Sequence, residues 1–104
     1  MATPVTNKET LLEQLLQHKE KIRSFGVQQL GLFGSFKRND AIHATSDVDL
    51  LVEFAPGEKT YDNFMELSFY LEDLLGRKVE LVTPQSLNKH IGPKILNQVE
   101  NVFS

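Results

Sequence analysis

Apolar residues recur along this chain at two spacings, one typical of helices and one typical of strands. From residue 7 to residue 25 they return every three to four positions, which predicts an amphipathic helix with one face in the core. A capping box formed by Thr6 and Glu9 marks its start, and Gly26 marks its end. The predicted core-facing positions are Leu11, Leu12, Leu15, Leu16 and Ile22.

Shorter, continuous apolar runs predict strands over residues 27–33, 47–54 and 78–82. One or two helical turns over residues 35–39 follow the first strand, and a loop over residues 41–46 leads to the second. A long helix separates the second strand from the third. Thr60 or Asp62 can serve as its N-cap, and Gly76 follows its last residue, Leu75.

The C-terminal part is predicted to be helical. Thr83 and Pro84 start a helical turn, because proline is favoured at a first helical position. A last helix begins at Gly92 and Pro93 and presents Ile95, Leu96, Val99 and Phe103. The order αβαβαβα predicts a single α/β (α+β) domain over residues 1–104, with a small mixed three-stranded sheet flanked by helices and a loose terminus over residues 1–6.

Composition narrows the class of protein. The 104 residues are 40% hydrophobic and 24% charged, which is ordinary for a globular domain, and they include no cysteine for disulfides or thiolate metal sites. The net charge of −3 argues against direct nucleic-acid binding, which normally needs a basic stripe. Because the sequence has no membrane-spanning run and no signal-peptide pattern, we expect no membrane association and a cytoplasmic location.

Two carboxylates at the start of the second predicted strand suggest a metal-binding site. Asp47 and Asp49 are two residues apart, so they point to the same face of a strand. Neighbouring carboxylates repel each other unless a cation lies between them, and oxygen ligands suit Mg²⁺. A lone pair of this kind is more often a helix cap, a turn or a solvated edge.

A phosphate-binding turn is predicted just upstream. Gly34 and Ser35 follow the first strand, where a turn that opens a helix presents backbone N–H groups to a phosphate, although glycine also commonly ends strands. Lys37 and Arg38 form the basic pair placed to meet phosphates, with a solvated helix turn as the alternative. The order of turn and carboxylates is that of a nucleotidyl-transfer site.

A third carboxylate, Glu80, stands alone among apolar residues of the third predicted strand. A charged residue there is costly unless it is paired or near water. One interpretation pairs it with a neighbouring lysine such as Lys78. If the third strand lies beside the second, Glu80 instead faces the same side as Asp47 and Asp49.

The stretch that joins these features, residues 31–54, is GLFGSFKRNDAIHATSDVDLLVEF. It resembles the signature of the DNA polymerase β-type nucleotidyltransferase superfamily, in its minimal (MNT) branch, and the likeness extends over nearly the whole chain. The chain departs from that pattern in having Asn39 where a glycine is usual, one additional residue before Asp47, and Glu80 where the third acid is normally Asp.

The resemblance implies a polymerase β-type fold and transfer of AMP from ATP. It implies that Asp47, Asp49 and Glu80 hold Mg²⁺ and perform catalysis, with Glu80 taking the proton from the attacking hydroxyl. The nucleotide-binding residues would be Gly34, Ser35, Lys37 and Arg38. The implied partner is a HEPN-domain RNase toxin, held in a hetero-oligomer and modified on a tyrosine, so that this chain acts as its antitoxin.

A docking surface for such a partner is predicted on the long helix. Met65 and Phe69, four residues apart, lie off the apolar stripe and among acidic residues, which suggests a contact with another protein. The alternative is that they pack under another helix of the same domain. The stripe itself consists of Phe64, Leu67, Leu71, Leu74 and Leu75.

Two other functions stay open at this point. A non-catalytic antitoxin would neutralise its partner by binding alone, and the Glu80 substitution and altered loop keep that alternative in play. A nucleotidyltransferase subunit acting on a small molecule, such as an aminoglycoside, is the second. The sequence identifies neither the acceptor nor the number of AMP groups added.

Overall fold

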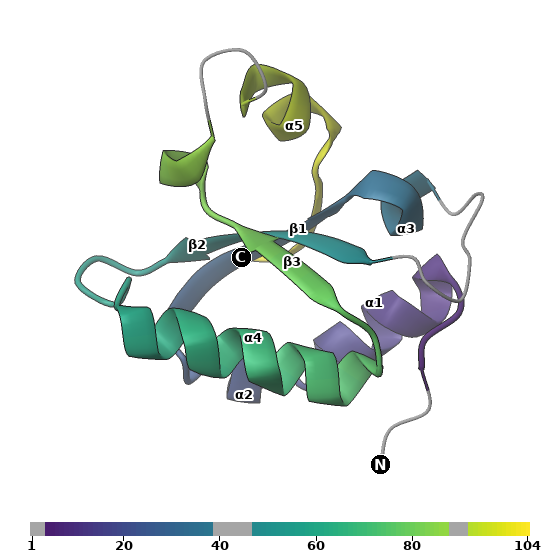
Figure 1. The fold of residues 1–104 in the computed structure, drawn as a ribbon, viewed down its shortest axis with the longest axis horizontal. Helices are drawn as coiled ribbons and strands as arrows, with labels where there is room; N and C mark the ends of the chain where they lie inside the picture. The colour runs from purple at the N-terminus through teal and green to yellow at the C-terminus, as the bar shows by residue number, and fades with distance from the viewer. Residues whose placement is uncertain (1–3, 39–46, 88–91) are drawn as a thin grey trace.

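A four-stranded sheet lies between two groups of helices in the computed structural model, which describes residues 4–38, 47–87 and 92–104 (Figure 1). The elements are α1 (Lys8–Gln17), α2 (Lys19–Arg23), β1 (Val27–Phe33), α3 (Gly34–Arg38), β2 (Val48–Phe54), α4 (Tyr61–Leu75), β3 (Val79–Val82), the 3₁₀ turn η1 (Pro84–Ser86), α5 (Gly92–Gln98) and β4 (Glu100–Phe103). The predicted loop over residues 41–46 and Asn39 lie outside the described residues.

The sheet is mixed, as the sequence predicts, and its strand order is β3-β2-β1-β4. β1 pairs antiparallel with both β2 and β4, whereas β2 pairs parallel with β3. The α+β class and the placement of the three predicted strands are confirmed. The strand count is wrong by one, because β4 adds a fourth strand at the edge beside β1.

β4 corrects the prediction that the last helix continues through Phe103. α5 ends at Gln98, and the chain then turns to pair with β1, so that Phe103 lies opposite Leu30. Phe103 is 4% exposed in the core, and Lys8 forms a 2.7 Å ion pair with Glu100. β4 pairs along the edge of β1 that β2 does not occupy. This long-range pairing outweighs the helical spacing of the local apolar residues, which does not reveal it.

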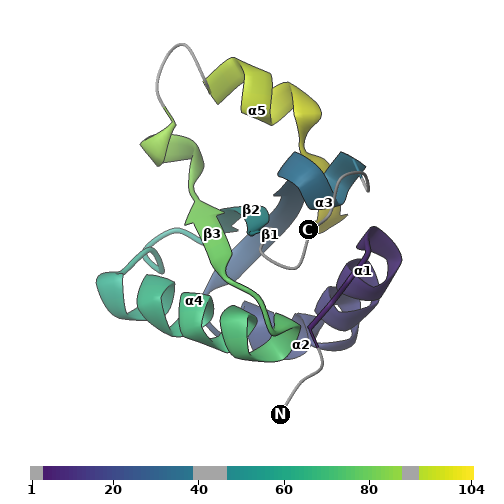
Figure 2. The ribbon, with the colours of Figure 1, turned by 45° about the vertical axis from the view of Figure 1, so that its right-hand side comes forward.

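The two faces of the sheet have different roles. α1, α2 and α4 cover one face, and α5, η1 and α3 lie on the other side or at its end (Figures 1 and 2). Along β2, Val48, Leu50 and Val52 are fully buried beneath the first group of helices. The alternate side chains, which include Asp49 and Glu53, therefore point to the second face.

Packing near the N-terminus differs from the prediction in three ways. Val5 is 1% exposed and its N–H donates to the carbonyl of Leu75, so the chain is packed at Val5. The N-cap of α1 is Asn7 rather than Thr6, because the Asn7 side chain accepts from the N–H of Thr10 at 2.8 Å. The single predicted helix is divided at residue 18, and Leu16 is 50% exposed instead of in the core.

α4 follows the prediction closely. Its N-cap is Thr60, whose hydroxyl accepts from the N–H of Asn63, and it ends at Gly76, which has a φ of +68°. Its fully buried residues are Leu67, Leu71 and Leu75. Within the described ranges, no helix is both long and apolar enough to cross a membrane.

Candidate active site

The turn between β1 and α3 lies directly against the first strand carboxylate. Gly34 opens α3 with a φ of +78°, a backbone conformation that other L residues rarely adopt. A Cβ atom on Gly34 would fall 2.1 Å from Oδ2 of Asp49. Backbone conformation and close approach therefore both require glycine here, and the Asp49 carboxylate faces the predicted phosphate turn.

Asp49 is the middle member of a row that crosses three strands. It lies opposite Phe33 of β1 on one side and opposite Glu80 of β3 on the other. Residues directly opposite each other on paired strands share a face of the sheet. The prediction that the second and third strands are adjacent is thus confirmed. Their pairing places Glu80 beside Asp49 on the face that α4 does not cover.

Asp47 stands immediately before β2, which begins one residue later than predicted. It is half-buried, like Asp49, whereas Val48 between them is fully buried. This alternation is expected when the two carboxylates share one face at the start of a strand.

The side chains of Asp47 and Asp49 fit a hard cation such as Mg²⁺, because they offer carboxylate oxygens at the rim of a sheet. Among residues 4–38, 47–87 and 92–104, no three His, Asp or Glu side chains are grouped closely enough to hold a metal ion. Glu80 is exposed on its strand and is not gathered with the two aspartates into one cage. Its role as a metal ligand stays a prediction.

α3 is anchored by one aromatic side chain. Phe36 is fully buried, and the guanidinium of Arg77 lies 5.0 Å from the centre of its ring. This anchor holds the start of α3 at the end of β1, where the phosphate turn is predicted. Lys37 is half-buried, and the side chains of Ser35 and Arg38 lie outside what the structure describes.

A family comparison decides the class of this site. The sequence profile of the nucleotidyltransferase domain matches residues 12–102, which include both aspartates, Glu80 and the glycine turn. The chain belongs to the nucleotidyltransferase domain family. The prediction of a nucleotidyltransferase is therefore confirmed.

Relatives of this nucleotidyltransferase include proteins named for adenylyl transfer to protein. It is 43% identical over 86 residues to the protein adenylyltransferase MntA of Thermococcus cleftensis, which covers 82% of this chain and 85% of that one. It is 35% identical over 96 residues to a candidate protein adenylyltransferase of Methanocaldococcus jannaschii, with 92% of this chain and 94% of that one covered.

Solved structures share the fold. A candidate minimal nucleotidyltransferase superposes with a TM-score of 0.78 at 30% identity, covering 90% of this chain and 94% of that chain. A structure of a tri-AMPylated HEPN toxin of Shewanella oneidensis in complex with its MNT antitoxin superposes with a TM-score of 0.66 at 18% identity, covering 93% and 72%. At that identity the second likeness shows the fold alone.

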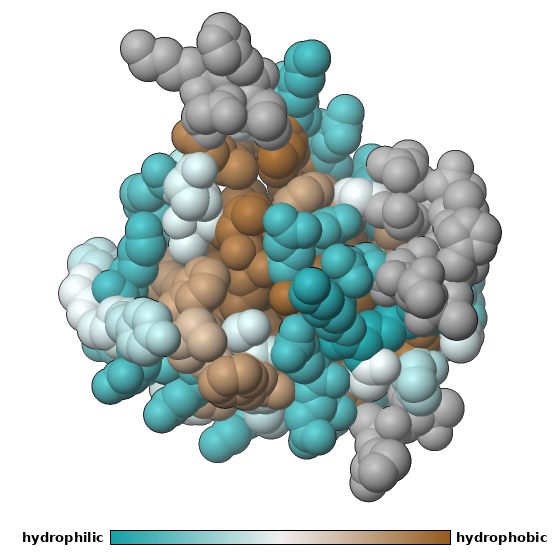
Figure 3. Space-filling view, viewed as in Figure 1, coloured by the Kyte–Doolittle hydropathy of each residue, from teal (hydrophilic) through white to brown (hydrophobic). Residues whose placement is uncertain are grey.

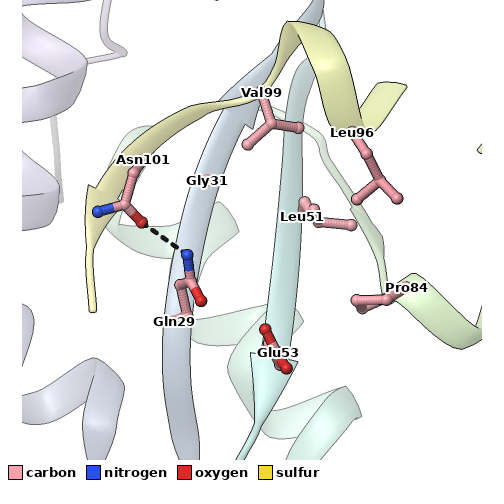
Figure 4. A pocket seen from close by; sticks show the side chains of 8 residues that line it. All are labelled: Gln29, Gly31, Leu51, Glu53, Pro84, Leu96, Val99 and Asn101. Atoms are coloured by element: carbon pink, nitrogen blue, oxygen red, sulfur yellow. Dashed lines mark hydrogen bonds between the residues drawn. The ribbon is translucent and has the colours of Figure 1, made fainter. Parts of the chain in front are cut away.

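The nucleotidyltransferase also has a pocket that the sequence analysis missed (Figure 4). It encloses about 240 Å³ on the same sheet face as Asp49. Its lining comes from β1, β2 and β4 below, and from η1, α5 and the residue that links α5 to β4 above. The lining residues are Gln29, Gly31, Leu51, Glu53, Pro84, Leu96, Val99 and Asn101. Since β4 was predicted as helix, the sequence offered no signal that would bring these residues together.

The predicted partner surface on α4 is only partly exposed. Phe69 is 61% exposed, which excludes the alternative that it packs under another helix of this domain, whereas Met65 is half-buried. Tyr61, four residues before Met65, is 78% exposed and extends the same face of the helix. The sequence pattern did not single out this residue. Figure 3 shows apolar surface over α4 and between the sheet and α5, with hydrophilic side chains around it.

Proposed function

We propose that this nucleotidyltransferase is a Mg²⁺-dependent protein adenylyltransferase of the cytoplasm. It transfers AMP from ATP to a tyrosine hydroxyl of a partner HEPN-domain toxin and thereby acts as the antitoxin. The family assignment supports nucleotidyl transfer, and the relative named MntA supports a protein as acceptor. The choice of a HEPN partner draws on the structural neighbours that contain such toxins.

The observation on which the proposal rests is the row that joins the glycine turn, Asp49 and Glu80. Gly34 lies against Asp49, and Asp49 lies in register with Glu80. A nucleotide with its outgoing phosphates at the turn would have its α-phosphate over Asp49. The acceptor hydroxyl would then approach from the side of Glu80, opposite the leaving group, as in-line displacement requires.

Each residue has a distinct role in this arrangement. Glu80 accepts the proton of the acceptor hydroxyl, whose oxygen forms a bond to the α-phosphorus. The bond from that phosphorus to the bridging oxygen breaks, and pyrophosphate leaves at the turn formed by Gly34 and Ser35, with Lys37 and Arg38 beside it. Asp47 and Asp49 would hold Mg²⁺, which when bound neutralises charge that develops on the phosphates.

The exposed face of α4 is proposed as the contact with the partner. Tyr61, Met65 and Phe69 form an apolar ridge, and Asp62 and Glu66 lie next to it on the same helix. A partner surface with apolar pockets and a basic rim would complement this ridge. Aromatic side chains are the residue types that most often dominate such contacts.

The test is transfer of labelled AMP to the purified partner. Wild-type protein with ATP and Mg²⁺ should label the partner on tyrosine, and removal of the metal with a chelator should stop the labelling. Replacement of the acceptor tyrosine by phenylalanine should also stop it, because that change removes only the hydroxyl.

Two other results would favour the remaining alternatives. If the wild type suppresses toxicity without labelling the partner, the protein neutralises by binding alone. If labelled AMP instead appears on a small molecule such as an aminoglycoside, the protein is a nucleotidyltransferase subunit with a different acceptor.

A further inference from the structure

The pocket beneath α5 lies on the catalytic face, a short way along the strands from the carboxylates. Leu51, in its floor, follows Asp49 by two residues on β2, which places their Cα atoms about 7 Å apart. Glu53 lies at the far end of the same strand face. We propose that this pocket binds the purine base of the nucleotide, an inference that rests on the proposed function.

The direction of the reaction favours the base as the occupant. The leaving pyrophosphate would lie at the turn after β1 and the acceptor near Glu80 on β3, so the reaction axis runs across the strands. In an in-line displacement the ribose is bonded to the α-phosphate roughly perpendicular to that axis. One such direction runs along β2, over Leu51 and into the pocket.

The location of the pocket argues against the acceptor side chain as the occupant. The lining residues that lie on strands other than β2 are Gln29, Gly31 and Asn101. They belong to β1 and β4, on the opposite side of Asp49 from Glu80. A ring seated there would hold its hydroxyl on the side of the leaving group. The proposed base, Glu80, could not then take its proton during attack.

The size and walls of the pocket suit a flat ring. Its volume of about 240 Å³ is below the roughly 300–1,000 Å³ of typical small-molecule pockets, so it would hold one ring system rather than a whole nucleotide. Leu51 forms the floor, and Leu96 and Val99 form the roof (Figure 4). The roof is held close to the sheet at Gly31, where a Cβ atom would fall 2.3 Å from Cγ1 of Val99.

The polar rim offers groups that can bind the edge of adenine. The Gln29 side-chain amide donates to the Asn101 side-chain oxygen at 3.1 Å, and Glu53 is exposed at the end of the pocket (Figure 4). The Glu53 carboxylate only accepts hydrogen bonds, so it can accept one from the exocyclic amine of adenine. Guanine presents a carbonyl oxygen at that ring position, which the carboxylate would repel.

The test fills the pocket without touching the phosphate site. Leu96 is 51% exposed on α5, so Leu96→Trp can place an indole in the pocket at little cost to folding. Leu16 on α1 is 50% exposed and lies on the opposite side of the sheet, which makes Leu16→Trp a matched control. Binding of ATP and of inorganic tripolyphosphate, each with Mg²⁺, is measured by calorimetry.

Leu96→Trp should weaken ATP binding by about tenfold or more, since loss of one base contact has an effect of that order. Tripolyphosphate binding should be unchanged, and Leu16→Trp should alter neither. Equal ATP affinity in Leu96→Trp and wild type would overturn the base pocket and leave the proposed function standing. If Leu96→Trp keeps its ATP affinity but no longer labels the partner, the pocket binds the acceptor instead of the base. Absence of ATP binding in the wild type would overturn both.

A second variant tests the polar rim. Wild-type protein should bind ATP more tightly than GTP, and Glu53→Gln should reduce that preference, because an amide can donate to the guanine carbonyl. Retention of the full preference in Glu53→Gln would remove Glu53 from the base contact.

Discussion

Gly34 and Asp49 are in direct contact, with the Asp49 carboxylate occupying the space that a side chain on Gly34 would need. The hypothetical Cβ atom lies 2.1 Å from Asp49 Oδ2, at a residue whose φ is +78°. The turn that would bind the outgoing phosphates and the carboxylate that would hold the metal are thus positioned by one shared contact. A change on either side of it should disturb both.

Gly34→Ala should therefore abolish AMP transfer and destabilise the protein by more than its backbone strain alone. Gly57 provides the matched control, because its φ is +80° and nothing lies within 4 Å of the position of its Cβ. Gly57→Ala should carry only the strain, about 1–2 kcal/mol, and keep activity. Thermal unfolding and labelled-AMP transfer check both variants. Comparable activity in the two would mean that the contact with Asp49 is not needed.

Asp47→Asn and Asp49→Asn should each eliminate AMP transfer and leave the fold intact, since each removes a charge and little volume. The reason is loss of the ligands proposed for Mg²⁺. Asp73→Asn is the control, because Asp73 is exposed on α4, which covers the opposite face of the sheet. Transfer assays and circular dichroism give the comparison. Full transfer in the double variant Asp47→Asn/Asp49→Asn would rule out their catalytic assignment.

Glu80→Gln should lower the single-turnover rate of AMP transfer by on the order of 10² or more. ATP affinity should be largely kept, because Glu80 is exposed beside Asp49 and is proposed to act on the acceptor proton rather than on the nucleotide. Glu80→Asp should retain part of the rate, as it preserves the charge and shortens the reach. A wild-type rate in Glu80→Gln would reduce Glu80 to a strand-edge residue.

Polar replacement of the α4 ridge should weaken partner binding. Phe69→Gln should do so by about tenfold or more with little change in melting temperature, because the side chain is 61% exposed. Adding Met65→Gln should weaken binding further, at a modest cost in stability from its half-buried side chain.

Leu16→Gln is the control for that experiment, as it removes a similarly exposed apolar residue from α1. Binding is measured by calorimetry with the catalytically inactive partner. Unchanged partner binding in Phe69→Gln would rule out this face of α4 as the partner contact.

Local signals in the sequence account for much of the fold. Thr60 and Gly76 delimit α4 because N-caps and left-handed C-terminal residues act within one turn of helix. β2 was predictable because its run of apolar residues is likewise a local feature of the sequence. Successive side chains of a strand point to opposite faces, and this geometry placed Asp47 and Asp49 on one face before any tertiary contact was known.

The elements that the sequence mispredicted depend on distant partners. Phe103 is strand rather than helix because the edge of β1 was available to pair with it. Val5 is buried in the core, and its N–H donates to the carbonyl of Leu75. Neither contact leaves a periodic signal in the residues around it. The division of the first helix at residue 18 and the exposure of Leu16 also left no signal in the local spacing of apolar residues.

The sequence by itself determined the chemistry that this site can offer: a glycine turn after one strand, two carboxylates on one face of the next, and a lone acid on a third. Only the tertiary structure decided how these groups meet. The parallel register of β2 and β3 brings Glu80 beside Asp49, and the contact with Gly34 joins the turn to the same row. The pocket under α5 also exists only in three dimensions, because its lining comes from strands and helices that pair across the whole chain.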